Sequence, residues 1–168
     1  MLTSRVGNTT DSTAKVAVTK DGKDASSLLT AQNASGELKV TTKDTTPAGD
    51  YVITVSKDGY TAASITVTVD KATVALADSG SKIGNIKVSA KVDGKAIELD
   101  NTSALSVQVV KANTTDKVDV EGTWSFDKLW RFTPAADAGL VAGDTLYISL
   151  AEGANYNAAG PVEITLAN

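Results

Sequence analysis

Apolar and polar residues alternate along most of the chain. In the stretch 63–69, which reads ASITVTV, Ile65, Val67 and Val69 fall on one face and hydroxyl residues on the other. This period of two is typical of a half-buried β-strand. The same alternation predicts strands over residues 14–19, 37–42, 51–56, 83–92, 105–110, 145–150 and 162–166.

Asp-Gly pairs lie between several of these stretches and predict turns. The pair at 58–59 separates two alternating runs, 51–56 and 63–69, and therefore predicts a hairpin. No long window has the spacing of an amphipathic helix, and residues 135–140, after Pro134, could form at most one helical turn. Short strands about 8–12 residues apart predict an all-β sandwich architecture.

The alternation lapses at residues 70–72 and then resumes, which indicates a domain junction. We therefore expect two sandwich domains, 1–71 and 72–168, each close to the lower end of common domain sizes. One large sandwich is the less favoured alternative. The first ten residues are polar and predict a loose lead-in.

The most distinctive stretch is 122–150, which holds both tryptophans and both phenylalanines. Trp124 and Phe126 share one strand face, Trp130 and Phe132 share another, and residues 127–129 between them are few enough for a hairpin turn. We interpret Trp124 as a core residue that fills the space between two sheets, because a large rigid ring does so at low entropy cost.

Residues of this stretch form a pattern of the kind W…FTPA…L..GD.LY, carried by Trp124, Phe132-Thr133-Pro134-Ala135, Leu140, Gly143-Asp144 and Thr145-Leu146-Tyr147. The pattern resembles the bacterial immunoglobulin-like domains that occur as tandem repeats in surface-layer (S-layer) and related cell-surface proteins. The earlier PAGDYVITVSKDGYTAASITVTV resembles the end of another such repeat. The resemblance implies two tandem immunoglobulin-like β-sandwich domains. Trp130 is an aromatic residue that the pattern does not require.

Composition narrows the function classes. The formal net charge is −4, and the 16 basic residues are scattered singly, whereas nucleic-acid binding needs clustered positive charge. Without cysteine or histidine the chain has no disulfide, no thiolate chemistry and no histidine base. No apolar run approaches about 18 residues, so we expect no membrane insertion. With no recognisable catalytic set, we expect no enzyme and no catalytic residue.

Three aromatic residues are candidate ligand contacts: Trp130, Tyr147 and Tyr156. Exposed rings of this kind could stack on sugars, whereas the alternative places Trp130 and Tyr147 in the core, since large aromatic residues are usually buried. The carboxylates do not form an EF-hand loop and are interpreted as solvated turn residues, Asp144 among them. No cofactor or metal site is therefore predicted, although calcium that bridges the two domains near Asp70, or that binds in a turn, is an open alternative.

The sequence thus predicts a non-catalytic module at the bacterial cell surface, in an S-layer or the cell wall, that acts as a spacer and self-assembly domain. Its expected partners are other copies or neighbouring domains of the same surface protein, and cell-wall or host glycans are a further option. The alternatives are a carbohydrate-binding or adhesin module, and an accessory domain of an exported glycosidase.

Overall fold

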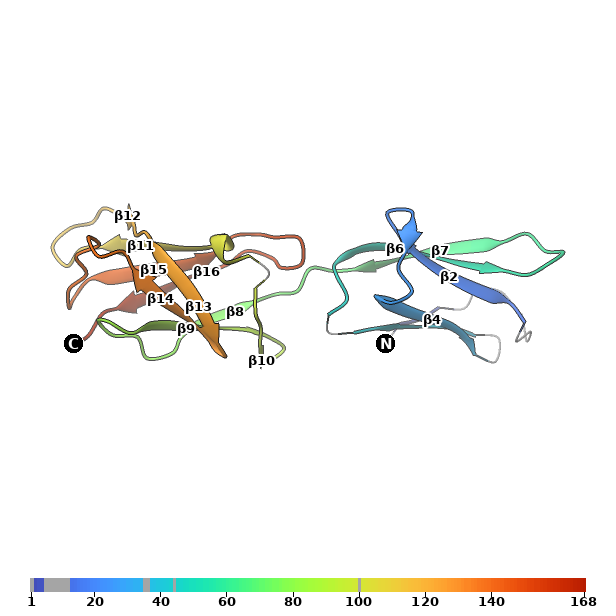
Figure 1. Cartoon of the computed structure of the whole chain (residues 1–168), viewed down its shortest axis with the longest axis horizontal. Helices are drawn as coiled ribbons and strands as arrows, with labels where there is room; N and C mark the ends of the chain where they lie inside the picture. Colours follow the sequence, from blue (N-terminus) through green and yellow to red (C-terminus); the bar gives the residue numbers. More distant parts are fainter. Residues whose placement is uncertain (1, 5–12, 35–36, 44, 100) are drawn as a thin grey trace. The chain divides into compact units, whose positions relative to one another are not determined.

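The computed structural model describes residues 2–4, 13–34, 37–43, 45–99 and 101–168, and it is all-β (Figure 1). The backbone divides into two compact units, unit 1 (Met1–Lys71) and unit 2 (Ala72–Asn168). Every pairing between the named strands is antiparallel. Within the described residues the one helical segment is a 3-10 turn at Thr102–Ala104, and no helix is long and apolar enough to cross a membrane.

Unit 1 forms two sheets, with strand orders β1-β5-β4 and β3-β2-β6-β7. Its strands are β1 (Leu2–Ser4), β2 (Lys15–Lys20), β3 (Lys23–Asp24), β4 (Leu29–Ala34), β5 (Glu37–Thr42), β6 (Gly49–Ser56) and β7 (Ala63–Val69). Both sheets contribute to one buried cluster: Val18, Ala25, Leu29, Leu38, Val40, Tyr51 and Ile53. The alternating pattern of the sequence therefore sends one face of each strand into a shared core, as a period of two requires.

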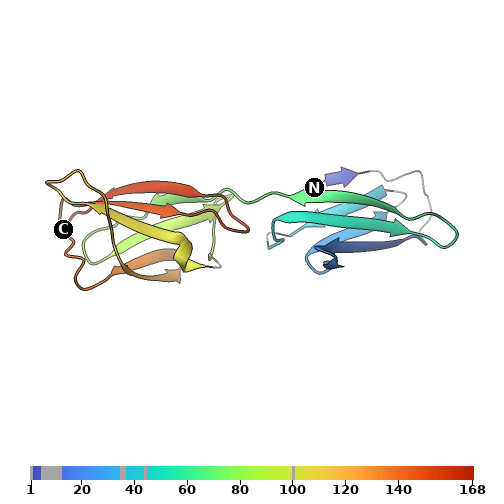
Figure 2. The same cartoon turned by 90° about the horizontal axis from the view of Figure 1, so that it is seen from above.

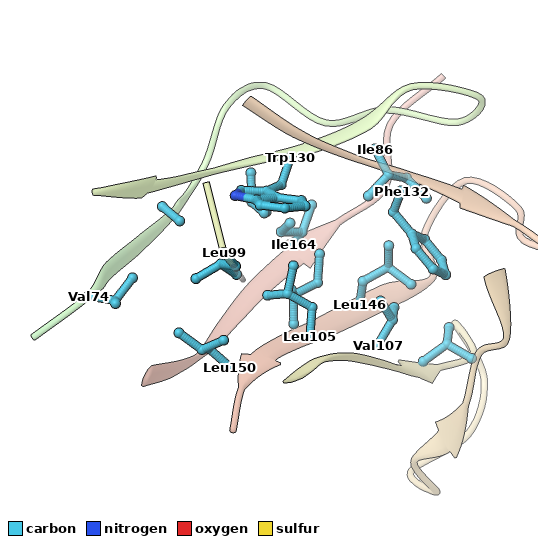
Figure 3. Close-up of a cluster of buried hydrophobic side chains, with 14 of the residues drawn as sticks. Val74, Ile86, Leu99, Leu105, Val107, Trp130, Phe132, Leu146, Leu150 and Ile164 are labelled. Carbon is cyan, nitrogen blue, oxygen red and sulfur yellow. The ribbon is translucent and has the colours of Figure 1, made fainter. Parts of the chain in front are cut away.

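Unit 2 also forms two sheets, which lie as two layers (Figure 2). One sheet has the order β10-β9-β14-β13, and in it β8 also pairs with β9. The other has the order β12-β11-β15-β16. Its strands are β8 (Ala75–Asp78), β9 (Ile86–Val92), β10 (Lys95–Ala96), β11 (Leu105–Val110), β12 (Val118–Asp119), β13 (Gly122–Asp127), β14 (Leu129–Pro134), β15 (Thr145–Leu150) and β16 (Ala159–Thr165). Figure 3 shows side chains of both sheets, such as Trp130, Phe132 and Leu146, meeting in the core.

The two units repeat one strand order. The order β3-β2-β6-β7 of unit 1 corresponds to β12-β11-β15-β16 of unit 2, and β1-β5-β4 corresponds to β9-β14-β13. Unit 2 adds β10 and also β8, which lies against β9 and close to β16. Within the described residues of unit 1, no strand corresponds to β8.

The turn chemistry explains the tight hairpins. Asp21-Gly22 and Asp93-Gly94 join β2 to β3 and β9 to β10, and all four residues have positive φ. Two consecutive positive-φ residues twist a turn in the sense that antiparallel strands need, and an Asp-Gly pair tolerates this backbone well. The predicted hairpin at Asp58-Gly59 is confirmed, since β7 pairs with β6 over its whole length, from Ala63 to Val69.

The all-β prediction is confirmed, and three local predictions are wrong. Leu2–Ser4 pairs with β5 instead of lying loose, while the rest of that predicted lead-in, residues 1 and 5–10, lies outside the described residues. Residues 135–140 form a non-helical turn, closed by the Ala138 amide donating to the Ala135 carbonyl (3.0 Å). The strand expected from residue 83 starts at Ile86, because Gly84, with φ 74°, belongs to a turn before it.

Candidate functional site

The four Trp and Phe residues form one aromatic cluster on the inner face of the β13–β14 hairpin. Trp124 lies opposite Phe132 and Phe126 opposite Trp130, with ring centroids 4.9 and 5.0 Å apart. Tilted aromatic pairs at this spacing add stability beyond the area that they bury. The tight turn runs through Lys128, which takes a left-handed backbone conformation (φ 57°). The cluster is therefore part of the core.

Trp130, not Trp124, is the buried tryptophan, so the interpretation of Trp124 as the residue between the sheets is corrected. Trp130 is 2% exposed and its Nε1–H donates to the Ile97 carbonyl (3.2 Å), whereas Trp124 is half-buried. The reason is strand order: β14 lies between β9 and β13, while β13 forms the edge of the sheet. In this arrangement Trp130 cannot stack on a sugar, because its ring does not reach the surface.

Tyr147 lies on the outer face of the β12-β11-β15-β16 sheet. Leu146, Ile148 and Leu150 point inward along β15, so the alternation turns Tyr147 outward. Strand register aligns it in one row across all four strands, with Gln108 on one side and Glu163 on the other, and Asp119 beyond Gln108. This outer row carries one aromatic ring, one amide and two carboxylates.

Polar contacts fix the outer row. The Gln108 Nε2 donates to Asp119 Oδ1 (2.9 Å), and the Lys117 ammonium stands 3.8 Å from the centroid of the Tyr147 ring. Partial burial raises the pKa of Tyr147, and the nearby Glu163 carboxylate adds to the rise because it repels a phenolate and accepts the hydroxyl hydrogen bond. The ring is thus a neutral hydrogen-bond donor with a cation above one face.

Tyr156 belongs to the loop that holds the start of unit 2. The Ala72 amide donates to the Asn155 carbonyl (2.8 Å), the Asn157 amide donates to the Ala72 carbonyl (3.0 Å), and Ala72 and Tyr156 form a parallel bridge. The Tyr156 side chain is half-buried and packs against the core of unit 2. The three candidate residues therefore lie in three places, the core, the outer face of one sheet and a loop, and do not form one platform.

Asp144 is the most unusual polar residue of the described chain, because it is completely buried (0% exposed). Its Oδ2 accepts from Lys111 Nζ and from the Val141 amide (both 3.0 Å), and its Oδ1 accepts from the Ala112 amide (3.2 Å). Lys111 also donates to the Gly139 carbonyl (2.6 Å). Asp144 is thus not the solvated turn aspartate that the sequence predicted.

The partners of Asp144 decide its charge. Burial by itself raises the pKa of Asp144, but it is outweighed by the hydrogen bonds from Val141, Lys111 and Ala112 together with the Lys111 charge. The net effect lowers the pKa below its usual range, so Asp144 is an anion at neutral pH. The cluster connects the end of β11 with the loop that enters β15. Its role is structural, because the protein itself supplies the hydrogen-bond partners of the Asp144 carboxylate.

The described residues contain no group of three or more acidic, histidine or cysteine side chains placed to hold a metal ion. Asp78 has a lowered pKa: burial raises it, but hydrogen bonds from Ser81 and from the amides of Gly80 and Ser79 outweigh that effect. The Ser81 amide donates to Asp78 Oδ1 at 2.9 Å, so this carboxylate caps its own loop. Asp70, beside which calcium was considered, is exposed.

A shallow apolar groove of about 310 Å³ opens at one end of unit 2. It is bordered by side chains such as Ile83, Pro134, Leu140 and Leu166. No charged or nucleophilic side chain lines it, so it offers contact area without reactive groups.

Comparison of the chain with protein-family models, with curated proteins and with solved structures finds no match. A function has to be argued from the residues and their arrangement.

Proposed function

We propose that the chain is a tandem pair of immunoglobulin-like domains, 1–71 and 72–168, serving as a non-catalytic structural module of a bacterial cell-surface protein, of the S-layer type. In this role it is a spacer that also takes part in self-assembly. Its partners are neighbouring domains and other copies of the same surface protein, and no cofactor is needed.

The repeated strand order carries this proposal. Immunoglobulin-like sandwiches have one sheet ordered A-B-E-D and another ordered C-F-G, extended in some members by a strand beside C. Unit 2 offers β8-β9-β14-β13 for the first sheet and β12-β11-β15-β16 for the second. Among the described residues, unit 1 repeats this order in β1-β5-β4 and β3-β2-β6-β7, without a counterpart of β8. A fold used twice in succession is the organisation expected of a spacer built from modules.

Tyr51 gives independent support. It is completely buried at the start of β6, the strand in the F position, and its hydroxyl donates to the carbonyl of Pro47 four residues upstream (2.8 Å). Immunoglobulin-like domains commonly have such a tyrosine near the start of strand F, bonded back to the preceding backbone. The placement at the cell surface rests on the FTPA and Gly-Asp-Tyr patterns of the sequence.

Stretching single molecules of the whole chain tests the spacer role. Two independent domains in series should unfold in two separate events, releasing up to about 250 and about 350 Å of chain at roughly 3.6 Å per residue. One event spanning both units, or extension without resistance, would contradict a spacer made of two modules. The Trp130→Ala variant is the control, since it should weaken only the longer event.

Glycan binding is a second candidate function, favoured by the outer row. Tyr147 lies on the outer face of its sheet between Gln108 and Glu163, and sugars bind to combinations of an aromatic ring with amide and carboxylate groups. Calorimetry of the whole chain with cell-wall polysaccharide fragments tests this role. Tyr147→Ala should abolish binding, whereas Tyr60→Ala should not, although the Tyr60 ring also has a lysine, Lys57, above it and is more exposed than the Tyr147 ring. Heat that is unchanged in Tyr147→Ala would dismiss the outer row as a glycan site.

A further inference from the structure

The edge of β7 is unlike the corresponding edge in unit 2. Strand β7 pairs with β6 over its whole length, from Gly49↔Val69 to Val55↔Ala63, with no register shift (Figure 1). Within the described part of the chain no strand pairs with its other edge. That edge presents a regular row of backbone amides and carbonyls, which is a template for another strand.

Strand β7 also lacks the features that usually protect an edge. Its sequence, ASITVTV, has no charge, no proline and no bulge. Its exposed face carries Ser64, Thr66 and Thr68. Its inward side chains are half-buried and pack on the core, as is usual at a sheet edge: Ile65, Val67 and Val69.

The corresponding strand of unit 2, β16, is protected in several ways. The exposed face of β16 carries a charged residue, Glu163, whereas the exposed face of β7 carries only hydroxyl residues. Strand β16 also contains Pro161, which has no N–H to donate. Its register shifts beside Ile148 and Leu150, and β8 lies close to it.

We propose that the β7 edge pairs with β7 of a second copy of this chain, in an antiparallel arrangement about a twofold axis at Thr66. The inference deepens the self-assembly part of the proposed function and rests on it. The second copy is the occupant because the strand is complementary to itself. Each Thr66 would face the partner's Thr66, each Ser64 the partner's Thr68, and each Ile65 the partner's Val67.

This pairing matches hydroxyl groups with hydroxyl groups on one face and apolar side chains with apolar side chains on the other. It opposes no like charges, since the strand has none. In contrast, the edge strand β13 begins directly after one exposed carboxylate, Glu121, and ends with another, Asp127. Pairing of β7 would join the two β3-β2-β6-β7 sheets into one continuous sheet and cover the remaining exposed area of Ile65, Val67 and Val69.

Sedimentation velocity of the whole chain over a wide concentration range tests the proposal. The wild-type chain should form dimers as concentration rises, and Thr66→Glu should weaken dimerisation at least about tenfold, because two carboxylates would then face each other. Thr165→Glu is the matched control: it adds the same charge to an exposed, outward position of β16 and should leave dimerisation unchanged. A wild-type chain that stays monomeric, or equal weakening by both variants, would overturn the proposal.

Amide hydrogen exchange of the wild-type chain keeps the test valid even if Thr66→Glu folds poorly. Amides of residues 63–69 should exchange more slowly at high concentration than at low concentration, while those of 159–165 should not change. Since the chain has no native cysteine, a Thr66→Cys variant should also form a disulfide-linked dimer under mild oxidation and Thr165→Cys should not. Unchanged exchange at 63–69 would reject the pairing, while two unfolding events under force would leave the spacer role standing.

Discussion

Units 1 and 2 share a strand order but close the same end of their sheets with different chemistry. In unit 1, Lys20 at the end of β2 donates to the Ala48 carbonyl, and its ammonium lies 5.0 Å from the centroid of the Tyr51 ring. In unit 2, Lys111 just after β11 donates to the Gly139 carbonyl. In both units a lysine holds the loop that leads into the following strand, β6 or β15.

The units differ in what accompanies that lysine. Unit 1 places a neutral, fully buried tyrosine there, and its hydroxyl binds the Pro47 carbonyl. Unit 2 places a fully buried carboxylate there, and the lysine neutralises it at 3.0 Å. The comparison teaches that a fold can keep its topology while it exchanges a neutral hydrogen bond for an ion pair, which changes how each unit should respond to mutation and pH.

The largest difference expected between the units comes from the tryptophans, because both belong to unit 2. Trp130→Ala should cost unit 2 about 3–5 kcal/mol of unfolding free energy, since it empties a buried core position. Trp124→Ala should cost less than about half as much, because its ring is half-buried at a sheet edge. Urea unfolding followed by the fluorescence of the remaining tryptophan measures both, and equal losses would contradict the assignment of Trp130 as the core residue.

The next largest effect is expected at Asp144. Asp144→Ala should destabilise unit 2 by about 2–4 kcal/mol, because it removes the acceptor of two buried backbone amides and the partner of Lys111. Asp50→Ala is the control, because Asp50 also follows a glycine directly but is exposed. It should lower the free energy of unfolding by less than about 1 kcal/mol. Thermal unfolding measures the loss of stability in both variants. Similar losses would mean that the buried contacts of Asp144 do not stabilise unit 2.

A smaller effect is expected for the tyrosine of unit 1. Tyr51→Phe keeps the buried ring but leaves the Pro47 carbonyl without its donor, which should cost unit 1 about 1–2 kcal/mol. Amide exchange of β6 measures this loss in unit 1 separately from unit 2. Tyr60→Phe is the control, because Tyr60 is 72% exposed, and a loss as large as that of Tyr51→Phe would argue against the Pro47 hydrogen bond.

The pH dependence of the two units should differ in direction. The folded pKa of Asp144 lies below its unfolded value of about 3.9, so its contribution is complete above that value and is lost as pH falls through the folded pKa. Unit 2 should therefore lose stability in acid. Thermal unfolding from pH 7 to pH 2, followed by tryptophan fluorescence, should show a weaker acid dependence in Asp144→Asn than in the wild-type chain.

For Tyr51 the sign is reversed. Burial raises its folded pKa above the unfolded value of about 10, and the negative charge of Asp21 adds to the rise. Its contribution is complete below pH 10 and is lost as pH rises through the folded pKa, so unit 1 should lose stability in alkali. Amide exchange is too fast to follow at such pH, so the measurement is the rate of limited proteolysis in β6 between pH 8 and 11. This rate should depend less on pH in Tyr51→Phe than in the wild-type chain.

Local features of the fold could be predicted from the sequence, whereas the burial of particular residues could not. Alternation such as that of 63–69 and the Asp-Gly pairs are properties of neighbouring residues, and they indicate strands and hairpins directly. The burial of Trp130 instead of Trp124 depends on β14 lying inside its sheet, which only the strand order determines. Asp144 is buried because Lys111, far away in the sequence, reaches it, and no local pattern indicates that pair.

The bridge at Ala72 has a consequence for protease digestion. Lys71 precedes a residue whose amide and carbonyl are both bonded to the loop containing Tyr156. A protease that cleaves after lysine needs several residues on each side of the scissile bond in an extended, unpaired conformation. Here the residue after that bond, Ala72, already forms backbone hydrogen bonds through both its amide and its carbonyl. The peptide bond between Lys71 and Ala72 should therefore be cut slowly by trypsin, although it lies at the boundary of two units where cleavage is usually fastest.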